Sequence, residues 1–360
     1  MKTNEYFPNE VSPPGETLQE LLGSRGITQS QLAERTGKHV KNINAIIQGK
    51  EAISPTTALS LERALGVPAA FWNEREKNYR AYLARIESVE RLETHVSLLK
   101  DYPIKEMAKH GWLRLSRHPV QQLEILLKFF GIASPDQLES CWTGSNVAYR
   151  HSPAFKSNPK AVAAWLRCGE IEAEKIRCKP FNRIRFERFL SEIRKLTETK
   201  PDEFAPALRE GCARCGVAVV FVPEIAGTHL SGARVWMLPS KARIQLSLRH
   251  KSNDHLWFTF LHEAAHVLKH PKRMVYIDSK DCPTNRIEEE ANAFARDWLI
   301  PPDRYDAFIA AKNFSAHAVV RFAESLGIAA GIVVGRLQHD GHIGHYLLNN
   351  LKQRFRWSNE

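Results

Sequence analysis

The sequence of 360 residues lacks the features that mark membrane and secreted proteins. It has no long uninterrupted apolar run, which argues against a membrane-spanning helix. Its start, from Met1 to Glu5, lacks the apolar core of a secretion signal. We therefore expect a cytoplasmic protein that is not bound to a membrane.

Cysteine is also sparse, and its spacing does not suggest a disulfide framework. Six cysteines are scattered through the chain, which favours reduced thiols. Cys212 and Cys215 form one closely spaced pair without a second pair to complete a structural zinc site, so we expect no redox or metal role for them. The six are Cys141, Cys168, Cys178, Cys212, Cys215 and Cys282.

Aspartate is absent from the first 80 residues, where ten Lys and Arg face nine Glu. The net charge of +11 therefore arises further along the chain. The most basic run could contact phosphates, but we interpret it as the solvated face of a helix. It comprises Lys175, Arg177, Lys179, Arg183, Arg185 and Arg188.

Length and composition predict several domains with packed cores. With 43% hydrophobic residues, 360 residues are too many for one average domain. We expect a helical DNA-binding domain over 1–80, a helical connector or dimerisation region over 81–180 and a domain with a small sheet over 181–360. The predicted fold class is thus mainly α with a small β-sheet.

The N-terminal region reads as short helices with clear start and stop signals. Thr28 and Gln31 form a capping box, and Gly37 ends the helix that follows. A third helix is expected to point Val40, Ile43, Ile46 and Ile47 inward. Ser54 and Pro55 then open a fourth helix.

Two short helices joined by a glycine turn, with amide and cationic side chains outward, are typical of a unit that reads the DNA major groove. A module that binds another protein is the alternative interpretation. A single unit reads few base pairs, so we expect a homodimer on two half-sites of a promoter. The candidate DNA contacts are Gln29, Lys38, His39, Lys41, Asn42 and Lys50.

This region resembles the HigA-type antitoxins within the Cro/repressor helix-turn-helix class, whose bundle is lambda-repressor-like. The resemblance implies dimers that bind inverted repeats in promoters, and it raises a toxin as a partner. The sequence departs from the family pattern near 73–76, which leaves the toxin partner open. The residues that carry the resemblance are Pro14-Gly15-Glu16, Gly49-Lys50, Ala58-Leu59, Leu65-Gly66 and Phe71-Trp72.

The segment His262-Glu263-Ala264-Ala265-His266 carries the clearest chemistry. On a helix, residues four apart share a face, so the two imidazoles can meet at one point with Glu263 beside it. A zinc peptidase needs three protein ligands, an open position for water and a carboxylate that accepts the proton of that water. His262 and His266 are therefore candidate ligands, and Glu263 is the candidate base.

The third ligand must come from elsewhere in the chain. The extended pattern with a further histidine is excluded, because its Gly and His positions are occupied by Lys269 and Lys272, and His270 is out of step with it. An acid on a predicted helix from Glu288 to Trp298 remains. We favour Glu288, with Asn292 on the same face as a hydrogen-bond partner of a ligand. Glu289 and Glu290 are the alternatives.

This half of the chain resembles the ImmA/IrrE family of zinc peptidases. The resemblance rests on the histidine-glutamate helix, on 288–295 with its ending Trp298-Leu299-Ile300-Pro301, and on preceding segments that predict small strands, 216–223, 234–237 and 244–248. It implies a zincin-like α+β domain with Zn²⁺ as cofactor that cuts repressor proteins in bacterial cells. His339, His342 and His345 are candidate helpers near the metal, or ordinary surface histidines.

Together these patterns predict a DNA-binding transcription regulator with a zinc endopeptidase of the gluzincin type, which cleaves a repressor-type protein. The alternative is a non-enzymatic HigA-like antitoxin or autorepressor whose metal site is sensory or structural.

Overall fold

The computed structural model describes residues 11–143, 158–271 and 284–357. These residues form a mainly helical structure with one small sheet, as predicted. The chain divides into two compact units, Met1–Val96 and Ser97–Glu360. The boundary between them falls inside the region expected to be a connector, and the division into three domains at 80 and 180 stays a prediction.

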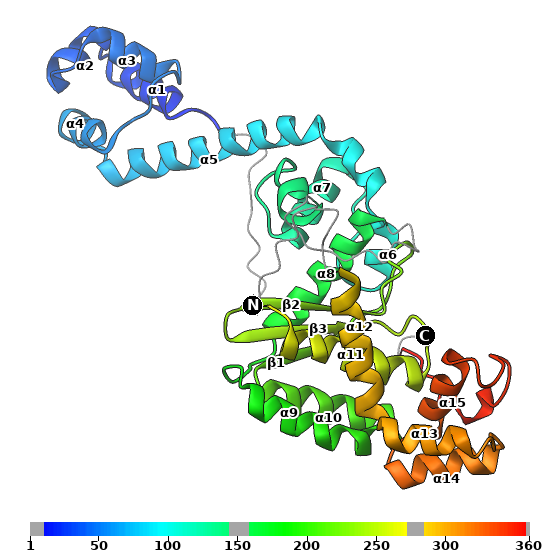
Figure 1. Cartoon of the computed structure of the whole chain (residues 1–360). Helices are drawn as coiled ribbons and strands as arrows, with labels where there is room; N and C mark the ends of the chain where they lie inside the picture. Colours follow the sequence, from blue (N-terminus) through cyan, green and yellow to red (C-terminus); the bar gives the residue numbers. More distant parts are fainter. Residues whose placement is uncertain (1–10, 144–157, 272–283, 358–360) are drawn as a thin grey trace. The chain divides into compact units, whose positions relative to one another are not determined.

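The first unit is a bundle of helices whose ends follow the predicted signals. The predicted capping box is confirmed, because the Gln31 amide donates to Thr28 Oγ1 (3.2 Å) and the Thr28 amide donates to Gln31 Oε1 (2.9 Å). Ser54 likewise caps the helix that starts at Pro55. The helices are α1 (Pro14–Arg25), α2 (Gln29–Thr36), α3 (Val40–Ile47), α4 (Pro55–Leu65) and α5 (Ala69–Glu93) (Figure 1).

The core of this unit is aliphatic around one tryptophan. Ile43, Ile46 and Ile47 of α3 are buried as predicted, but Val40 is 43% exposed. The expectation for Val40 was wrong because this residue is the first of α3 and lies at the exposed end of the helix. In α5, Glu76 Oε2 accepts a hydrogen bond from the Ile53 amide (3.0 Å), which fixes the segment between α3 and α4. The core comprises Leu18, Leu22, Leu32, Ile43, Ile46, Leu61, Leu65 and Trp72.

The second unit is built around a three-stranded sheet of order β1-β3-β2. β1 (Val217–Phe221) runs parallel to β3 (Lys241–Leu246), and β2 (Gly232–Leu238) runs antiparallel to β3. All three overlap the predicted segments, 216–223, 234–237 and 244–248, although β3 begins three residues earlier than predicted. The α-helices of this unit are α6 (Ile104–Lys109), α7 (Pro119–Phe130), α8 (Pro159–Glu174), α9 (Arg183–Glu192), α10 (Pro201–Arg214), α11 (Asn253–Lys269), α12 (Thr284–Leu299), α13 (Pro302–Ala310), α14 (Ala316–Leu326) and α15 (Ala330–His339).

Short non-α helices complete the unit. They are η1 (Val96–Asp101), η2 (Glu139–Thr143), η3 (Ile193–Glu198) and η4 (Asn349–Leu351).

Helices cover both faces of the sheet. Because side chains alternate along a strand, Ile244 of β3 joins the core that α11 shares, whereas Gln245 faces the other way. There the Gln245 amide donates to the carbonyl oxygen of Trp165 in α8 (2.7 Å). The apolar segment 161–167, which carried no visible chemistry in the sequence, thus helps to cover the second face.

The C-terminal residues hold the beginning of α11 in place. Lys352 Nζ lies 2.6 Å from Asp254 Oδ2, and both side chains are more than 90% buried. A Cβ on Gly335 of α15 would come 2.6 Å from the same carboxylate oxygen, so α15 approaches α11 closely. The tail therefore packs on the core of this unit, as predicted. Among the described residues no single helix is long and apolar enough to cross a membrane. Only when α14 and α15 are taken together do they reach the length and apolar composition of a span, and the two helices are bent by 114° relative to each other.

The buried Asp254–Lys352 pair makes the stability of this unit dependent on pH. Burial raises the pKa of Asp254, but the contacts with Lys352 and Ser252 outweigh it and hold the pKa below its ordinary value. The pair therefore stabilises the fold fully above the ordinary aspartate pKa near 3.8, and this contribution is lost as the pH falls through the lower folded value.

We expect Asp254→Asn to lower the free energy of unfolding by about 3–5 kcal/mol at pH 7, because it leaves a buried ammonium without its counter-charge. Urea titrations at pH 7 and at pH 3 measure this, and the difference between variant and wild type should shrink at pH 3. The matched control is Glu74→Gln, which removes the charge from the exposed pair Glu74–Lys77 and should leave stability unchanged. Equal stability of Asp254→Asn and wild type at pH 7 would contradict the role of the pair.

Candidate functional site

The helix α11 presents its histidines along one polar edge because its other faces are apolar and buried. His262 and His266 are one turn apart, and α12 lies alongside α11 (Figure 1). The helix begins after Ser252, which is extended, and ends at Lys269. The residues that bury its apolar faces are Leu256, Trp257, Phe260, Leu261, Ala264, Val267 and Leu268.

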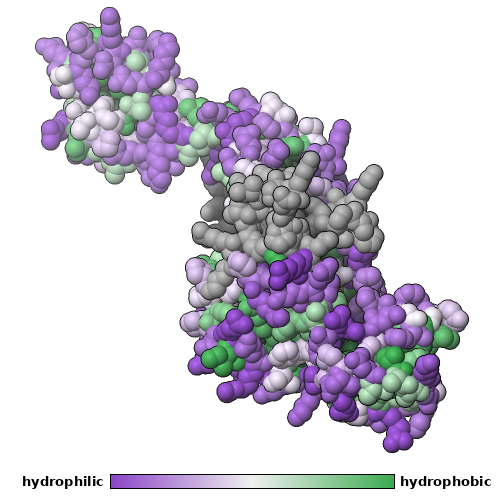
Figure 2. Space-filling model, in the orientation of Figure 1, coloured by the Kyte–Doolittle hydropathy of each residue, from purple (hydrophilic) through white to green (hydrophobic). Residues whose placement is uncertain are grey.

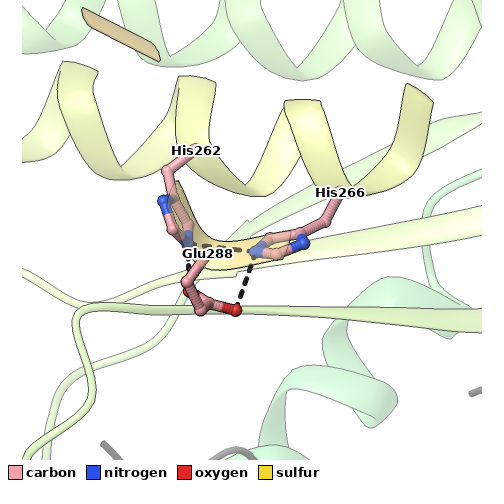
Figure 3. Close-up of side chains that lie close together, drawn as sticks. All are labelled: His262, His266 and Glu288. Atoms are coloured by element: carbon pink, nitrogen blue, oxygen red, sulfur yellow. Dashed lines mark hydrogen bonds and ion pairs between the residues drawn. The ribbon is translucent and has the colours of Figure 1, made fainter. Parts of the chain in front are cut away.

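Two imidazoles and one carboxylate converge at this edge (Figure 3). The Nε2 atoms of His262 and His266 lie 3.0 Å apart. Glu288, from α12, places Oε2 3.2 Å from His262 Nε2 and Oε1 3.4 Å from His266 Nε2. Three side chains that the sequence predicts as a group thus lie together, although they come from two helices.

The donor set fits a small divalent cation. With metal–ligand bonds of about 2.0–2.1 Å, the donor atoms of a tetrahedral zinc site are separated by roughly 3.3 Å. The two Nε2 atoms are 3.0 Å apart, and each lies 3.2–3.4 Å from a different oxygen of the Glu288 carboxylate, which is close to that spacing. Two imidazoles and a carboxylate are also the ligand types that zinc accepts. A fourth tetrahedral position would remain for a water molecule or a substrate oxygen.

A hydrogen bond from α12 orients one of the imidazoles. Asn292 Oδ1 lies 2.9 Å from His262 Nδ1. Because the amide oxygen only accepts, His262 Nδ1 donates, and its Nε2 carries the lone pair that faces the cluster. Asn292 therefore lies where the sequence places it, one turn along α12 from Glu288.

Glu263 lies beside the cluster, toward strand β2. Its side chain is 8% exposed. A Cβ on Gly232, the first residue of β2, would come 3.0 Å from Glu263 Oε1 and 2.6 Å from Thr259 Cγ2. Strand and helix can approach this closely only because residue 232 has no side chain. The side chain of Glu263 is thus held between α11 and β2.

The alternative acids lie elsewhere. Glu289 is exposed, and Glu290 contacts Lys269 and His270 instead of the histidine pair. The candidate helper histidines have other neighbours among the described residues. His339 contacts Asp340, the His342 ring packs near Tyr305 and Phe314, and the carbonyl group of His345 accepts from Gln338.

His270, which the sequence pattern excludes as a third metal ligand, lies next to the cluster. His270 is 8% exposed, and its Nδ1 lies 2.7 Å from His266 Nδ1, on the side of His266 away from His262. Its spacing of four residues from His266 was the available signal. That signal was missed because only a pattern with a third metal-binding histidine was considered, and His270 does not match it.

The candidate DNA contacts lie at the surface of the first unit. Four of them are exposed, namely His39, Lys41, Asn42 and Lys50. Gln29, the first residue of α2, and Lys38, between α2 and α3, are half-buried. The face of this unit that Figure 2 shows is mostly hydrophilic. Such a surface can form hydrogen bonds and charge contacts with nucleic acid.

Two residues of the basic run form exposed ion pairs. Lys175, at the C-cap of α8, pairs with Glu172, and Arg183 pairs with Glu187 on α9. The run is not the face of one helix as interpreted, because Arg177 and Lys179 lie between α8 and α9. Cys212 is buried, and burial raises its pKa well above the ordinary value, which disfavours a reactive thiolate.

Two family models match the chain. One, described as helix-turn-helix, matches residues 18–72, and the other, a peptidase family described as IrrE N-terminal-like domain, matches residues 212–338. The chain joins an XRE-type helix-turn-helix domain to an ImmA/IrrE-like domain. The helix-turn-helix match supports a DNA-binding regulator. The IrrE-like match supports a metallopeptidase, and that family implies a metal, usually zinc. The His262–His266–Glu288 cluster lies within the second match.

Two solved structures each match about a quarter of the chain. An addiction module antidote protein of the HigA family from Coxiella burnetii is 28% identical over 24% of this chain and 94% of its own, with a TM-score of 0.22. A putative antidote protein of a plasmid maintenance system from Nostoc punctiforme is 25% identical over 23% of this chain and 91% of its own, with a TM-score of 0.23. The search of curated proteins gives no match.

Proposed function

We propose that this protein is a transcription regulator that binds promoter DNA through its helix-turn-helix domain and cleaves a repressor-type protein with its IrrE-like domain. The observation that carries the proposal is the convergence of His262, His266 and Glu288 to within 4.8 Å of one another beside Glu263. Three donors with a neighbouring carboxylate are what zinc-dependent hydrolysis of a peptide bond requires.

In this mechanism His262, His266 and Glu288 would hold the zinc ion. A bound zinc ion lowers the pKa of water toward about 7 and polarises a carbonyl group. Asn292 fixes the His262 ring through its Nδ1, so that Nε2 stays directed at the site.

Glu263 supplies the proton transfers. Its carboxylate would accept the proton of the attacking water and return it to the departing amine nitrogen. Burial between α11 and β2 holds the carboxylate in one place, which limits the reorganisation that the proton transfer needs.

Strand β2 suits an extended peptide as substrate. In the part of the chain that the structure describes, β2 pairs with β3 on one side and stands at the edge of the sheet. Its residues are half-buried along most of the strand, and α11 packs beside it. A peptide that adds to this edge by main-chain hydrogen bonds would run past Glu263. This arrangement favours an unfolded or loop segment of a protein.

The DNA-binding half of the proposal rests on the helix-turn-helix domain. Lys41 and Asn42 lie exposed at the start of α3, where an amide and an ammonium can reach base edges in a major groove. A homodimer on two half-sites follows from the few base pairs that one unit can read. A non-enzymatic autorepressor or antitoxin is the second candidate, because the first unit has a core of its own and needs no peptidase to bind DNA.

We expect Glu263→Gln to retain zinc but to lose cleavage by about 10²–10⁴-fold, because the amide cannot accept the proton. The measurement counts new protein N-termini by mass spectrometry in cells that express wild type or variant, together with the zinc content of both purified proteins. Glu289→Gln, an exposed neighbour of Glu288, is the matched control and should cleave as wild type does.

Equal cleavage by Glu263→Gln and wild type would refute the assigned base. Absence of wild-type cleavage, with promoter binding intact, would favour the non-enzymatic autorepressor.

We expect the double variant Lys41→Ala/Asn42→Ala to bind the DNA upstream of its own gene at least about tenfold more weakly, since each good base contact contributes about 1–3 kcal/mol. Gel-shift titrations at fixed salt measure the change. Lys77→Ala removes an exposed lysine from α5 of the same unit and should bind nearly as wild type does. Unchanged affinity of the double variant would remove α3 from the DNA interface.

A further inference from the structure

A buried histidine stands behind one of the candidate metal ligands. We propose that His270, supported by Glu290, is a positioning residue that fixes the ring orientation and the proton of His266 for metal binding. This inference rests on the proposed function of the His262–His266–Glu288 cluster, and it assigns a role to two residues that supply no atom to that cluster.

Proline explains why His270 reaches this position. The residue before a proline is driven out of the helical region, and His270 precedes Pro271. Its backbone is extended (φ −107°, ψ 151°), so α11 stops at Lys269. Arg234 Nη1, from β2, donates to the Pro271 carbonyl oxygen (3.3 Å). The imidazole of His270 is thereby folded against His266 and buried.

The contact between the His266 and His270 rings, together with the lone pair that a cation needs, decides which nitrogen of His266 carries the proton. His266 Nδ1 and His270 Nδ1 are 2.7 Å apart, so one of them donates and the other accepts. His266 Nε2 faces the carboxylate and His262, and it needs its lone pair to bind a cation. The proton of His266 therefore belongs on Nδ1, and His270 Nδ1 accepts it.

The same reasoning extends to Glu290. Because His270 accepts at Nδ1, its own proton is on Nε2. That nitrogen lies 3.6 Å from Glu290 Oε2, and Lys269 Nζ lies 3.4 Å from Glu290 Oε1. A carboxylate at this end favours the N–H of His270 on Nε2. The result is a chain of contacts from Glu290 through His270 to His266 and the metal site.

The two ligand imidazoles are thus supported in different ways. His262 donates to a neutral amide oxygen, whereas His266 donates to an imidazole that faces a carboxylate. Groups that hydrogen-bond to metal-binding histidines fix the tautomer and increase ligand basicity, and their loss costs about 10–100-fold in metal affinity. His270 therefore contributes to metal affinity without binding the metal.

The test measures the zinc affinity of the full chain by competition with a chromogenic chelator. We expect His270→Ala to bind zinc about 10–100-fold more weakly. His270→Gln should recover part of this loss, because its amide oxygen can accept from His266 Nδ1. Glu290→Gln, which leaves the buried ring in place, should weaken binding by a smaller factor, and the matched control Glu289→Gln should bind as wild type does.

A second measurement separates positioning from packing. In ¹⁵N spectra of the metal-free protein, the His266 imidazole should carry its proton on Nδ1 in wild type and in His270→Gln, and should show mixed tautomers in His270→Ala. A purely structural role would not move this signal in the folded protein.

The outcomes also separate this inference from the proposed function. If His262→Ala loses zinc while His270→Ala, His270→Gln and Glu290→Gln all bind within twofold of wild type, the positioning role is refuted and the metal centre stands. If His262→Ala binds zinc as tightly as wild type does, the metal centre itself is wrong, and the inference falls with it.

Discussion

The chemistry of this protein depends on the burial of the apolar faces of α11. Its aliphatic and aromatic residues pack against the sheet, α12 and α15, so that the helix cannot rotate and its polar edge points one way. A helical turn then sets His262 and His266 one above the other. The remaining contacts hold this polar edge and its neighbouring groups in place. Asp254 and Lys352 hold the start of the helix, Gly232 lets β2 approach Glu263, and α12 adds Glu288.

Local patterns in the sequence predict much of this arrangement, because their causes are local. Thr28, Gln31 and Ser54 cap helices through their own side chains, and short apolar segments mark the strands. The spacing of the two histidines puts them on one face of α11. The helical period likewise puts Glu288 and Asn292 on one face of α12. The helix-turn-helix and IrrE-like matches agree with these predictions.

What the sequence does not reveal depends on contacts between distant segments. Nothing in the period of 161–167 says that α8 will cover the second face of the sheet, because that depends on Gln245 and Trp165 meeting across 80 residues. The pairing of Asp254 with Lys352, across the whole C-terminal part, is equally non-local. The contact of His270 with His266 requires α11 to end at Lys269, because His270 precedes Pro271 and is extended, a backbone effect that helical periodicity does not describe.

X-ray absorption at the zinc edge of the zinc-loaded full chain tests the central claim most directly. Two imidazoles and a carboxylate should give nitrogen and oxygen neighbours at about 2.0–2.2 Å with the outer-shell scattering of two rings, reduced to one ring in His262→Ala. Sulfur neighbours at about 2.3 Å, or a spectrum that His262→Ala leaves unchanged, would contradict the metal centre described here.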